Sequence, residues 1–225
     1  MSTLLQLKTQ LCSEFSVDDV DSMADAGQFI NYWYRHVWGG AVWNDSKEFI
    51  TQSYPAGSTS VTLGSTIELV VATSWDGTHL PEMPKEDIIK IEPSRITSTG
   101  VPTHYINDPR DASDNCVLRL VPIPESTKDM TLVVKKKFVE LSSNSDVPKL
   151  KGIDETLLAY SRVSMLRRDF QYGKASASLT EADRMLMKMV DIENNQQQKH
   201  YHMTPTVYDV VGRNLKSANK QNIYG

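Results

Sequence analysis

Hydrophobic residues recur with a helical period near both ends of the chain and with a period of two between them. A short helix is predicted over residues 3–15, where Leu4, Leu7 and Leu11 lie on one face. A second helix is predicted over residues 22–38, because large apolar side chains recur there every three or four positions. These side chains are Phe29, Ile30, Trp33, Tyr34 and Val37. We expect them to pack in a core between helices, and an aromatic ligand cage is the alternative interpretation.

From Lys47 onward apolar residues alternate with polar ones, which is the pattern of half-buried strands. Glycine and proline residues separate the alternating segments, and Pro122 and Pro124 should end one of them because proline donates no ladder hydrogen bond. Short strands at such regular spacing predict an antiparallel sheet or a small sandwich. The predicted strands are residues 47–54, 59–63, 66–73, 87–92, 103–107, 117–121 and 130–140.

Helical spacing returns at Asp154. The stripe that we expect this helix to bury consists of Leu157, Leu158, Ser161, Met165 and Leu166. Gly173 and the small residues 175–177 are predicted to form a connection. Ser178 and Glu181 then have the spacing of a capping box, which predicts the start of a further helix. Its predicted buried face consists of Met185, Leu186, Met189, Val190 and Ile192.

The C-terminal segment, residues 203–225, contains too few apolar groups to offset the entropy of ordering it alone. It nevertheless retains valines and tyrosines, which a tail that serves only as a solvated tether rarely does. We therefore expect an extended arm that becomes ordered on another subunit, with plain disorder as the alternative. The pattern as a whole predicts an α+β protein with four segments: residues 1–44, 45–141, 148–202 and 203–225.

Composition and charge narrow the class of protein. The chain is 40% hydrophobic and 23% charged, which is ordinary for a protein with a buried core. Its net charge of −4 is uneven, since residues 1–46 carry six acidic and two basic residues, whereas residues 203–225 carry one and three. An acidic body argues against gripping nucleic acid with the main surface. The chain contains no apolar run long enough for a membrane span, and its first residues lack the pattern of a secretory signal.

Three consecutive lysines, Lys135, Lys136 and Lys137, place charge on both faces of the last predicted strand. We expect them at a sheet edge or on a strand end that projects past the core, where lysine also blocks unwanted strand pairing. A phosphate-binding patch is the alternative. The two cysteines, Cys12 and Cys116, occur in unlike contexts, and we expect both to be buried and reduced.

We find no motif that indicates catalysis, a cofactor or a metal. His200 and His202 are two positions apart, which on a helix points them in different directions. Asp108, Asp111 and Asp114 recur every third residue but lack the ligand alternation and central glycine of a calcium loop. We therefore predict a protein that is not an enzyme and has no catalytic residues, metal site or cofactor. A pair of carboxylates brought together by the fold would be the remaining route to a hydrolase.

The order of the local sequences is the most informative feature, and it resembles the head-to-tail adaptor (neck or connector) proteins of tailed bacteriophages, chiefly short-tailed ones. The resemblance covers about residues 20–195. The stretches that carry it, in order, are Trp43-Asn44-Asp45, Ser60-Val61-Thr62-Leu63, Ile67-Glu68-Leu69-Val70-Val71-Ala72, Asp76-Gly77-Thr78-His79-Leu80, Gly100-Val101-Pro102-Thr103-His104-Tyr105, Leu118-Arg119-Leu120-Val121-Pro122-Ile123-Pro124 and Asp146-Val147-Pro148.

This resemblance implies a helical bundle, built from the N- and C-terminal helices, that carries an inserted antiparallel β domain. It also implies a homo-oligomeric ring, usually a dodecamer, between the portal protein and the tail nozzle or tail tube. The ring would line a channel through which DNA passes without sequence-specific binding. The protein would be assembled in the host cytoplasm and located in the virion neck. The C-terminal arm would reach the portal, and its expected partner-binding residues are Tyr208, Arg213, Lys216 and Tyr224.

Two other functions remain compatible with the sequence. A tail-tube or tail-completion subunit would polymerise or bind the tail without affinity for the portal. A carbohydrate-binding β-sandwich module is the alternative from a different class, and it would need aromatic residues on the surface of one sheet. The tryptophans Trp33, Trp38, Trp43 and Trp75 fall mainly in the helical segment, which does not favour it.

Overall fold

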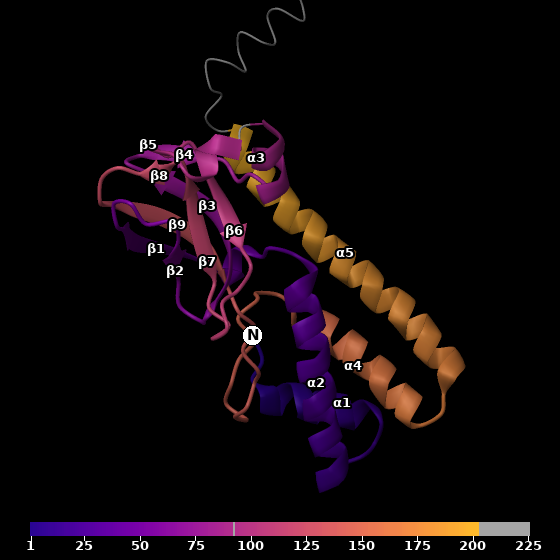
Figure 1. Ribbon diagram of the computed structural model, residues 1–225. Helices are drawn as coiled ribbons and strands as arrows, with labels where there is room; N and C mark the ends of the chain where they lie inside the picture. Colours follow the sequence, from indigo (N-terminus) through magenta and orange to yellow (C-terminus); the bar gives the residue numbers. More distant parts are fainter. Residues whose placement is uncertain (92, 203–225) are drawn as a thin grey trace, which may run out of the picture. The chain divides into compact units, whose positions relative to one another are not determined.

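The computed structural model describes residues 1–91 and 93–202 (Figure 1). It confirms a mixed α+β protein in which helices precede and follow a β domain along the chain. The chain divides into two compact units, one formed by residues 1–154 and the other beginning at residue 155. None of the helices in the described residues has the length and apolarity needed to span a bilayer.

The two N-terminal helices are α1 (Leu4–Glu14) and α2 (Val20–Gly40). Helix α1 begins at a capping box, in which the side chain of Thr3 accepts from the backbone N–H of Gln6 and the Gln6 side chain accepts from that of Thr3. Asp19 caps α2 by accepting from the N–H of Ser22. The predicted apolar stripes of both helices are confirmed as buried, except that Phe29 is only partly buried.

The β domain consists mainly of two antiparallel sheets. The first has the order β1 (Lys47–Tyr54), β9 (Lys128–Lys136), β3 (Ile67–Trp75) and β4 (Thr78–Leu80). The second has the order β2 (Val61–Thr62), β7 (Val117–Val121) and β6 (His104–Asp108). Side chains from both sheets meet in one apolar core, whose members include Tyr54, Val70, Trp75, Leu118, Leu120, Met130 and Leu132. The strands predicted at 47–54 and 117–121 have the predicted bounds.

A parallel pair departs from the expected antiparallel pattern. Strand β5 (Thr99–Gly100) pairs in parallel with β8 (Ile123–Pro124). Strand β8 lies in the proline-containing segment that was predicted to end the strand pairing. Pro122 does end β7, as predicted, but Pro124 takes part in this short second strand.

The predicted strand at 87–92 is wrong, because helix α3 (Lys85–Ile91) occupies this place and the 3-10 helix η2 (Pro93–Ile96) follows it. Its isoleucines suggested a strand, but the order of the charged residues before and after Ile88 and Ile89 favours a helix. Glu86 and Asp87 lie in the first turn and Lys90 in the last, which suits the helix dipole. Asp87 and Lys90 also form an ion pair at 3.5 Å, at the i,i+3 spacing of a helix.

The segment that returns from the β domain is tied to α2. Asn31 donates to the carbonyl oxygen of Leu141 and accepts from its N–H, both at 2.9 Å. The hydroxyl of Tyr34 accepts from the N–H of Lys149 at 2.9 Å. Beyond α2, in the 3-10 helix η1 (Asn44–Ser46), Asp45 accepts from the N–H of Lys151 at 2.9 Å. The β domain is therefore an insertion whose two ends come together beside α2.

The second unit contains α4 (Asp154–Arg168), which begins at the last residue of the first unit, and α5 (Tyr172–His202). The two helices form a hairpin, since Tyr160 donates to Asp183 at 2.7 Å and Thr156 donates to the sulfur of Met189 at 3.2 Å. The predicted stripe of α4 is confirmed as buried. That these helices share one bundle with α1 and α2 stays a prediction.

The predicted connection at 173–177 and the helix start at Ser178 are wrong. The chain reverses at residues 169–171, where Phe170 has a φ of 57° and the N–H of Gln171 donates to the carbonyl oxygen of Leu166 at 2.8 Å. Gly173 and the small residues after it then continue α5, because alanine and serine are tolerated in a helix. The predicted burial of Ile192 is also wrong, since its side chain is 58% exposed.

We predict that Leu118→Ala lowers the free energy of unfolding by about 2–5 kcal/mol, because it opens a cavity between the two sheets. Urea unfolding followed by circular dichroism measures this change. Leu5→Ala is the matched control, since Leu5 is 44% exposed and its truncation should cost less than about 1 kcal/mol. Equal losses for the two variants would contradict the placement of the core.

Candidate functional site

The described residues contain no group of three or more His, Cys, Asp or Glu side chains that could hold a metal ion. The aspartates at 108, 111 and 114 serve three separate structural contacts instead. Asp108 accepts from Arg119 at 2.8 Å and lies 3.6 Å from the Lys85 ammonium group. Asp111 accepts from the N–H groups of residues 113 and 115, and the hydrogen bonds from Asn115 lower its pKa. Asp114 pairs with Lys137.

The cysteines also have the expected state, because both are free and buried. Burial raises the pKa of the Cys116 thiol, which disfavours the thiolate that a nucleophile needs. The side chains of His200 and His202 lie outside the described ones.

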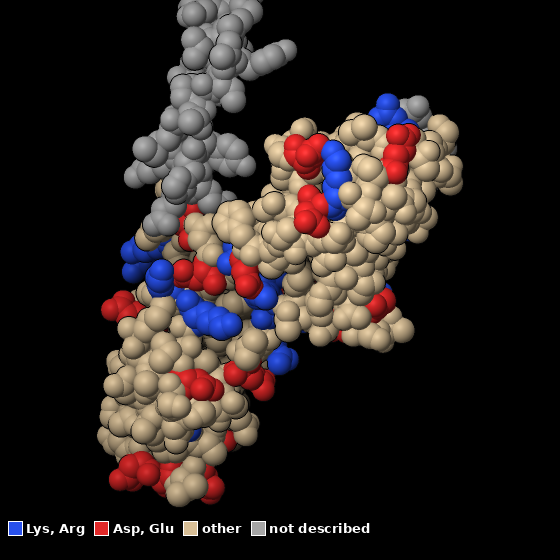
Figure 2. Space-filling model, turned by 90° about the vertical axis from the view of Figure 1, so that its left-hand side faces the viewer, with Lys and Arg blue, Asp and Glu red and all other residues tan. Residues whose placement is uncertain are grey.

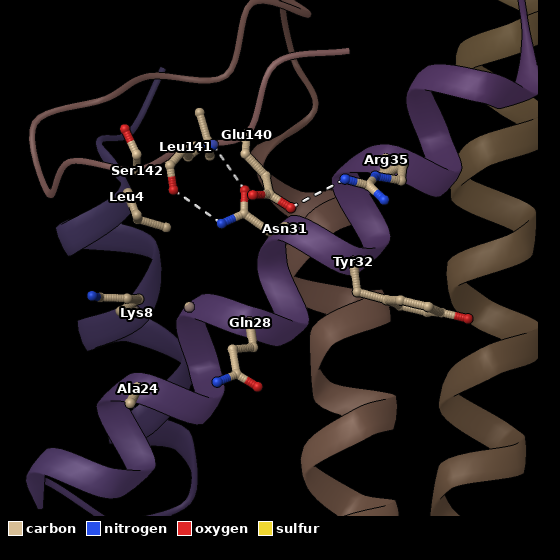
Figure 3. A pocket seen from close by; sticks show the side chains of 11 residues that line it. Leu4, Lys8, Ala24, Gln28, Asn31, Tyr32, Arg35, Glu140, Leu141 and Ser142 are labelled. Carbon is tan, nitrogen blue, oxygen red and sulfur yellow. Dashed lines mark hydrogen bonds and ion pairs between the residues drawn. The ribbon is translucent and has the colours of Figure 1, made fainter.

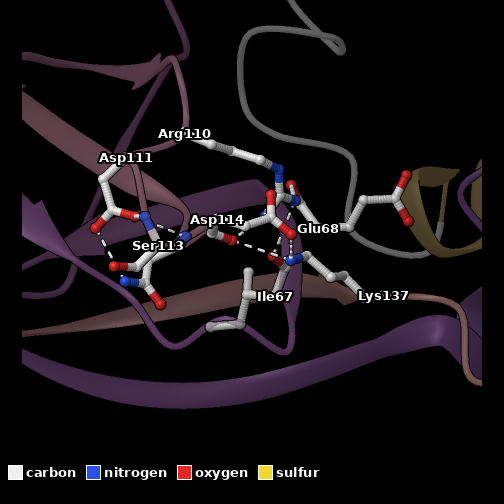
Figure 4. Close-up of polar contacts among 8 residues, drawn as sticks. Ile67, Glu68, Arg110, Asp111, Ser113, Asp114 and Lys137 are labelled. Atoms are coloured by element: carbon white, nitrogen blue, oxygen red, sulfur yellow. Dashed lines mark hydrogen bonds and ion pairs between the residues drawn. The ribbon is translucent and has the colours of Figure 1, made fainter.

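The lysine triplet lies at the end of β9, which is one of the two predicted places, but the predicted sheet edge is wrong and Lys135 is buried instead of projecting past the core. Strand β9 pairs with β1 on one side and with β3 on the other, which makes it a central strand. Lys135 is 3% exposed and donates to Glu68 at 3.2 Å, and Lys136 pairs with Glu48 at 2.5 Å. Lys137, just past the end of β9, pairs with Asp114 (Figure 4). Carboxylates on β1, β3 and the loop after β6 therefore neutralise all three charges.

Arg110 completes this charge cluster (Figure 4). Its guanidinium group donates to the carbonyl oxygens of Ile67 and Glu68 at 3.0 and 2.5 Å, beside an irregularity in the pairing of β3 with β9. It also donates to the carbonyl oxygen of Asp114 at 2.8 Å. The cluster ties the loop after β6 to the edge of β3. A phosphate group would have to displace a carboxylate from each lysine, so this arrangement favours a structural role over a phosphate site.

A hollow of about 420 Å³ lies along α2 (Figure 3). Its polar groups are largely used in contacts with the returning segment: Asn31 binds Leu141, Arg35 pairs with Glu140 at 3.2 Å, and Lys8 donates to Asn144 at 2.9 Å. The residues that line it are Leu4, Lys8, Ala24, Gly27, Gln28, Asn31, Tyr32, Arg35, Glu140, Leu141 and Ser142. This set contains no nucleophile paired with a base and no pair of carboxylates.

Several large apolar side chains are exposed, and two of them form a pair. Phe170 and Tyr172, in the turn between α4 and α5, are 78% and 62% exposed. Their rings meet edge to face with centroids 6.3 Å apart. Phe49 on β1 is also 78% exposed, and Val20 at the start of α2 is 85% exposed. Exposed aromatic side chains are typical anchors of protein–protein contacts.

Charged residues do not separate into large fields of one sign on the face shown in Figure 2, where basic and acidic side chains lie interspersed. Such a surface suits contacts with proteins better than a broad phosphate-binding surface.

The predicted partner-binding residues Tyr208, Arg213, Lys216 and Tyr224 lie outside the described residues. The aromatic pair Phe170 and Tyr172 was missed in the sequence, because the connection between the last two helices was placed after Gly173. The available signal was the run Arg167-Arg168-Asp169-Phe170-Gln171-Tyr172, in which two aromatic residues interrupt a charged stretch that lacks the helical apolar period.

No model of a known protein family matches the chain, and no curated protein matches its sequence.

We predict that Glu68→Gln lowers the free energy of unfolding by about 2 kcal/mol, because it leaves the buried ammonium group of Lys135 without a counter-charge. The double variant Glu68→Gln/Lys135→Met should recover most of this loss. Glu140→Gln is the matched control, since Glu140 and its partner Arg35 are 61% and 67% exposed and should contribute less than about 1 kcal/mol. Urea unfolding of the four proteins checks the prediction, and a double variant less stable than Glu68→Gln would contradict it.

Proposed function

We propose that this chain is a structural subunit of a bacteriophage virion, which assembles into a ring that joins the portal of the head to the tail. The observation that carries this proposal is the insertion of an antiparallel β domain between two pairs of helices. This is the architecture that the sequence resemblance to head-to-tail adaptor proteins implies. Along the chain, two helices precede the β domain and two helices follow it, which is the order that this resemblance implies.

The distribution of charged and apolar side chains supports the same proposal. The most deeply buried charged side chains of the β domain form internal ion pairs, such as Lys135 with Glu68 and Asp108 with Arg119. Large apolar side chains, in contrast, are exposed on β1, on α2 and in the turn between α4 and α5. A subunit that is completed by assembly needs apolar contact surfaces, and it needs no reacting groups.

The C-terminal arm is the proposed contact with the portal. Helix α5 ends at His202, and residues 203–225 carry three basic and one acidic residue together with Tyr208 and Tyr224. Tyrosine and arginine are the residues most often found at the centres of protein–protein contacts, and basic residues suit an acidic partner surface. In this proposal Tyr208, Arg213, Lys216 and Tyr224 anchor the arm.

A ring of such subunits would carry a net negative charge, because each copy has a net charge of −4. Repulsion between this charge and the phosphates would let DNA pass through the channel without binding to its wall. The protein would be located in the virion neck after assembly in the host cytoplasm, with the tail nozzle or tail tube as its second partner. It would need no cofactor.

A carbohydrate-binding module receives no support from the aromatic residues. All four tryptophans are buried, with exposed fractions between 3% and 8%. Trp38 and Trp43 use their ring N–H groups to donate to backbone carbonyl oxygens. A sugar-binding platform would need several aromatic rings side by side on one sheet, whereas the outer side of β1 presents the single ring of Phe49.

We predict that the purified protein forms a ring-shaped complex with the portal protein of the same virus, and that deletion of residues 203–225 abolishes it. Electron microscopy and mass photometry of the mixture measure both outcomes. A variant with residues 203–225 in shuffled order is the matched control, because it keeps the length and charge of the arm. Undiminished binding by the deletion variant would contradict the role of the arm, and binding to the tail alone would instead indicate a tail-completion subunit.

A further inference from the structure

The turn between α4 and α5 combines exposed aromatic rings with positive charge. We call residues 167–174 the hairpin tip. It contains three basic residues and one acidic residue, and both Arg167 and Lys174 are exposed. Between these charges lie Phe170 and Tyr172, which are 78% and 62% exposed and in edge-to-face contact. An aromatic centre with a charged border is the usual composition of a protein-binding site.

The start of α2 has the opposite charge around an apolar side chain. We call residues 18–21 the acidic turn. Val20 is 85% exposed, and the exposed carboxylates of Asp18, Asp19 and Asp21 surround it in the sequence. The longer stretch 13–25 contains five acidic residues and no basic residue. Asp19 is needed as the N-cap of α2, but no helix-capping contact requires the exposed valine.

We propose that the hairpin tip of one copy of the chain binds the acidic turn of the next copy. Each surface offers apolar area at its centre and charge at its border, and the two borders are opposite in sign, which favours this pairing and disfavours contact between two like surfaces. The contact joins different surfaces of two copies. Repeated contacts of this kind close into a ring when the rotation between copies allows it. This inference depends on the proposed ring and identifies its subunit interface.

A further exposed aromatic residue, Phe49, provides a competing explanation. Phe49 lies on β1, an edge strand of eight residues, and the residues on the same side of the strand are Lys47, Thr51 and Ser53. A strand from another chain could pair with this edge. Phe49 forms no aromatic pair with a second exposed ring among the described residues, whereas Phe170 and Tyr172 do, so the hairpin tip is the better-supported interface. Phe49 and Phe170 are equally exposed, which makes Phe49 a matched control.

Disulfide trapping tests the contact between copies directly. One copy carries Val20→Cys, a second copy of different mass carries Tyr172→Cys, and the native Cys12 and Cys116 are buried and should not compete. We expect a disulfide between the two copies, with or without the portal present, and only background linkage when Phe49→Cys replaces Val20→Cys. A linkage to Phe49→Cys of equal yield, or no linkage between copies in either condition, would overturn the proposal. So would a double variant Val20→Cys/Tyr172→Cys that forms its disulfide only within single chains on dilution.

Substitutions then measure how much each group contributes. Phe170→Ala should weaken association between copies by about tenfold or more, whereas Phe49→Ala should leave it unchanged. Asp18→Lys and Lys174→Glu should each weaken it by about three- to tenfold, and the double variant should recover part of the loss because the charges are exchanged. Sedimentation velocity over a range of concentrations and salt measures these changes, and circular dichroism checks the fold. An effect of Phe49→Ala larger than that of Phe170→Ala would contradict the proposal.

The two proposals fail in different ways. If copies link through the hairpin tip and the acidic turn but none binds the portal, the subunit interface holds and the connector function is wrong. If the protein forms a ring on the portal and Phe170→Ala does not alter that ring, the connector function holds and the interface is wrong.

Discussion

The hydrogen bonds between α2 and the segment that returns from the β domain determine the architecture of the first unit. Asn31 binds both backbone groups of Leu141, Tyr34 accepts from Lys149, and Trp38 donates to the carbonyl oxygen of Lys136 at 3.2 Å. These donors and acceptors are buried or partly buried, so leaving them unpaired would cost free energy. The chain therefore leaves α2, forms two sheets and comes back to the same helix. An inserted domain held in this way can extend from a helical body without a flexible linker on either side.

In part of this protein a charged side chain is buried, and large apolar side chains are exposed to solvent. Lys135 is buried in the centre of a sheet and depends on Glu68, whereas Phe170, Tyr172 and Val20 are exposed. A buried ion pair contributes little net stability compared with an apolar pair, but it specifies which strands lie together. Exposed aromatic rings are unfavourable in an isolated subunit and become favourable when a partner covers them. Exposed rings of this kind are consistent with the proposed assembly.

The sequence predicted regular elements well where one signal dominated. The strand at 47–54 is bounded by the breakers that begin at Pro55, and the structure has the same bounds. Prediction failed where two signals competed. The isoleucines near residue 88 suggested a strand, but the order of the charges favours a helix, and the capping-box spacing at Ser178 occurs inside α5. The charged surroundings of Lys135 depend on pairing between distant strands, which no local pattern reveals. The hairpin tip was missed for a different reason, because its turn was placed at residues 173–177 although a local signal was present at residues 167–172.

The proposed function requires this protein to be a component of the virion at the junction of head and tail. Immunogold electron microscopy of intact virions, with antibodies against the β domain, tests that claim most directly. The account predicts gold particles at the single vertex where the tail joins the head, and none on the capsid faces or along the tail. Labelling distributed over the capsid or the tail, or virions without the protein, would contradict it.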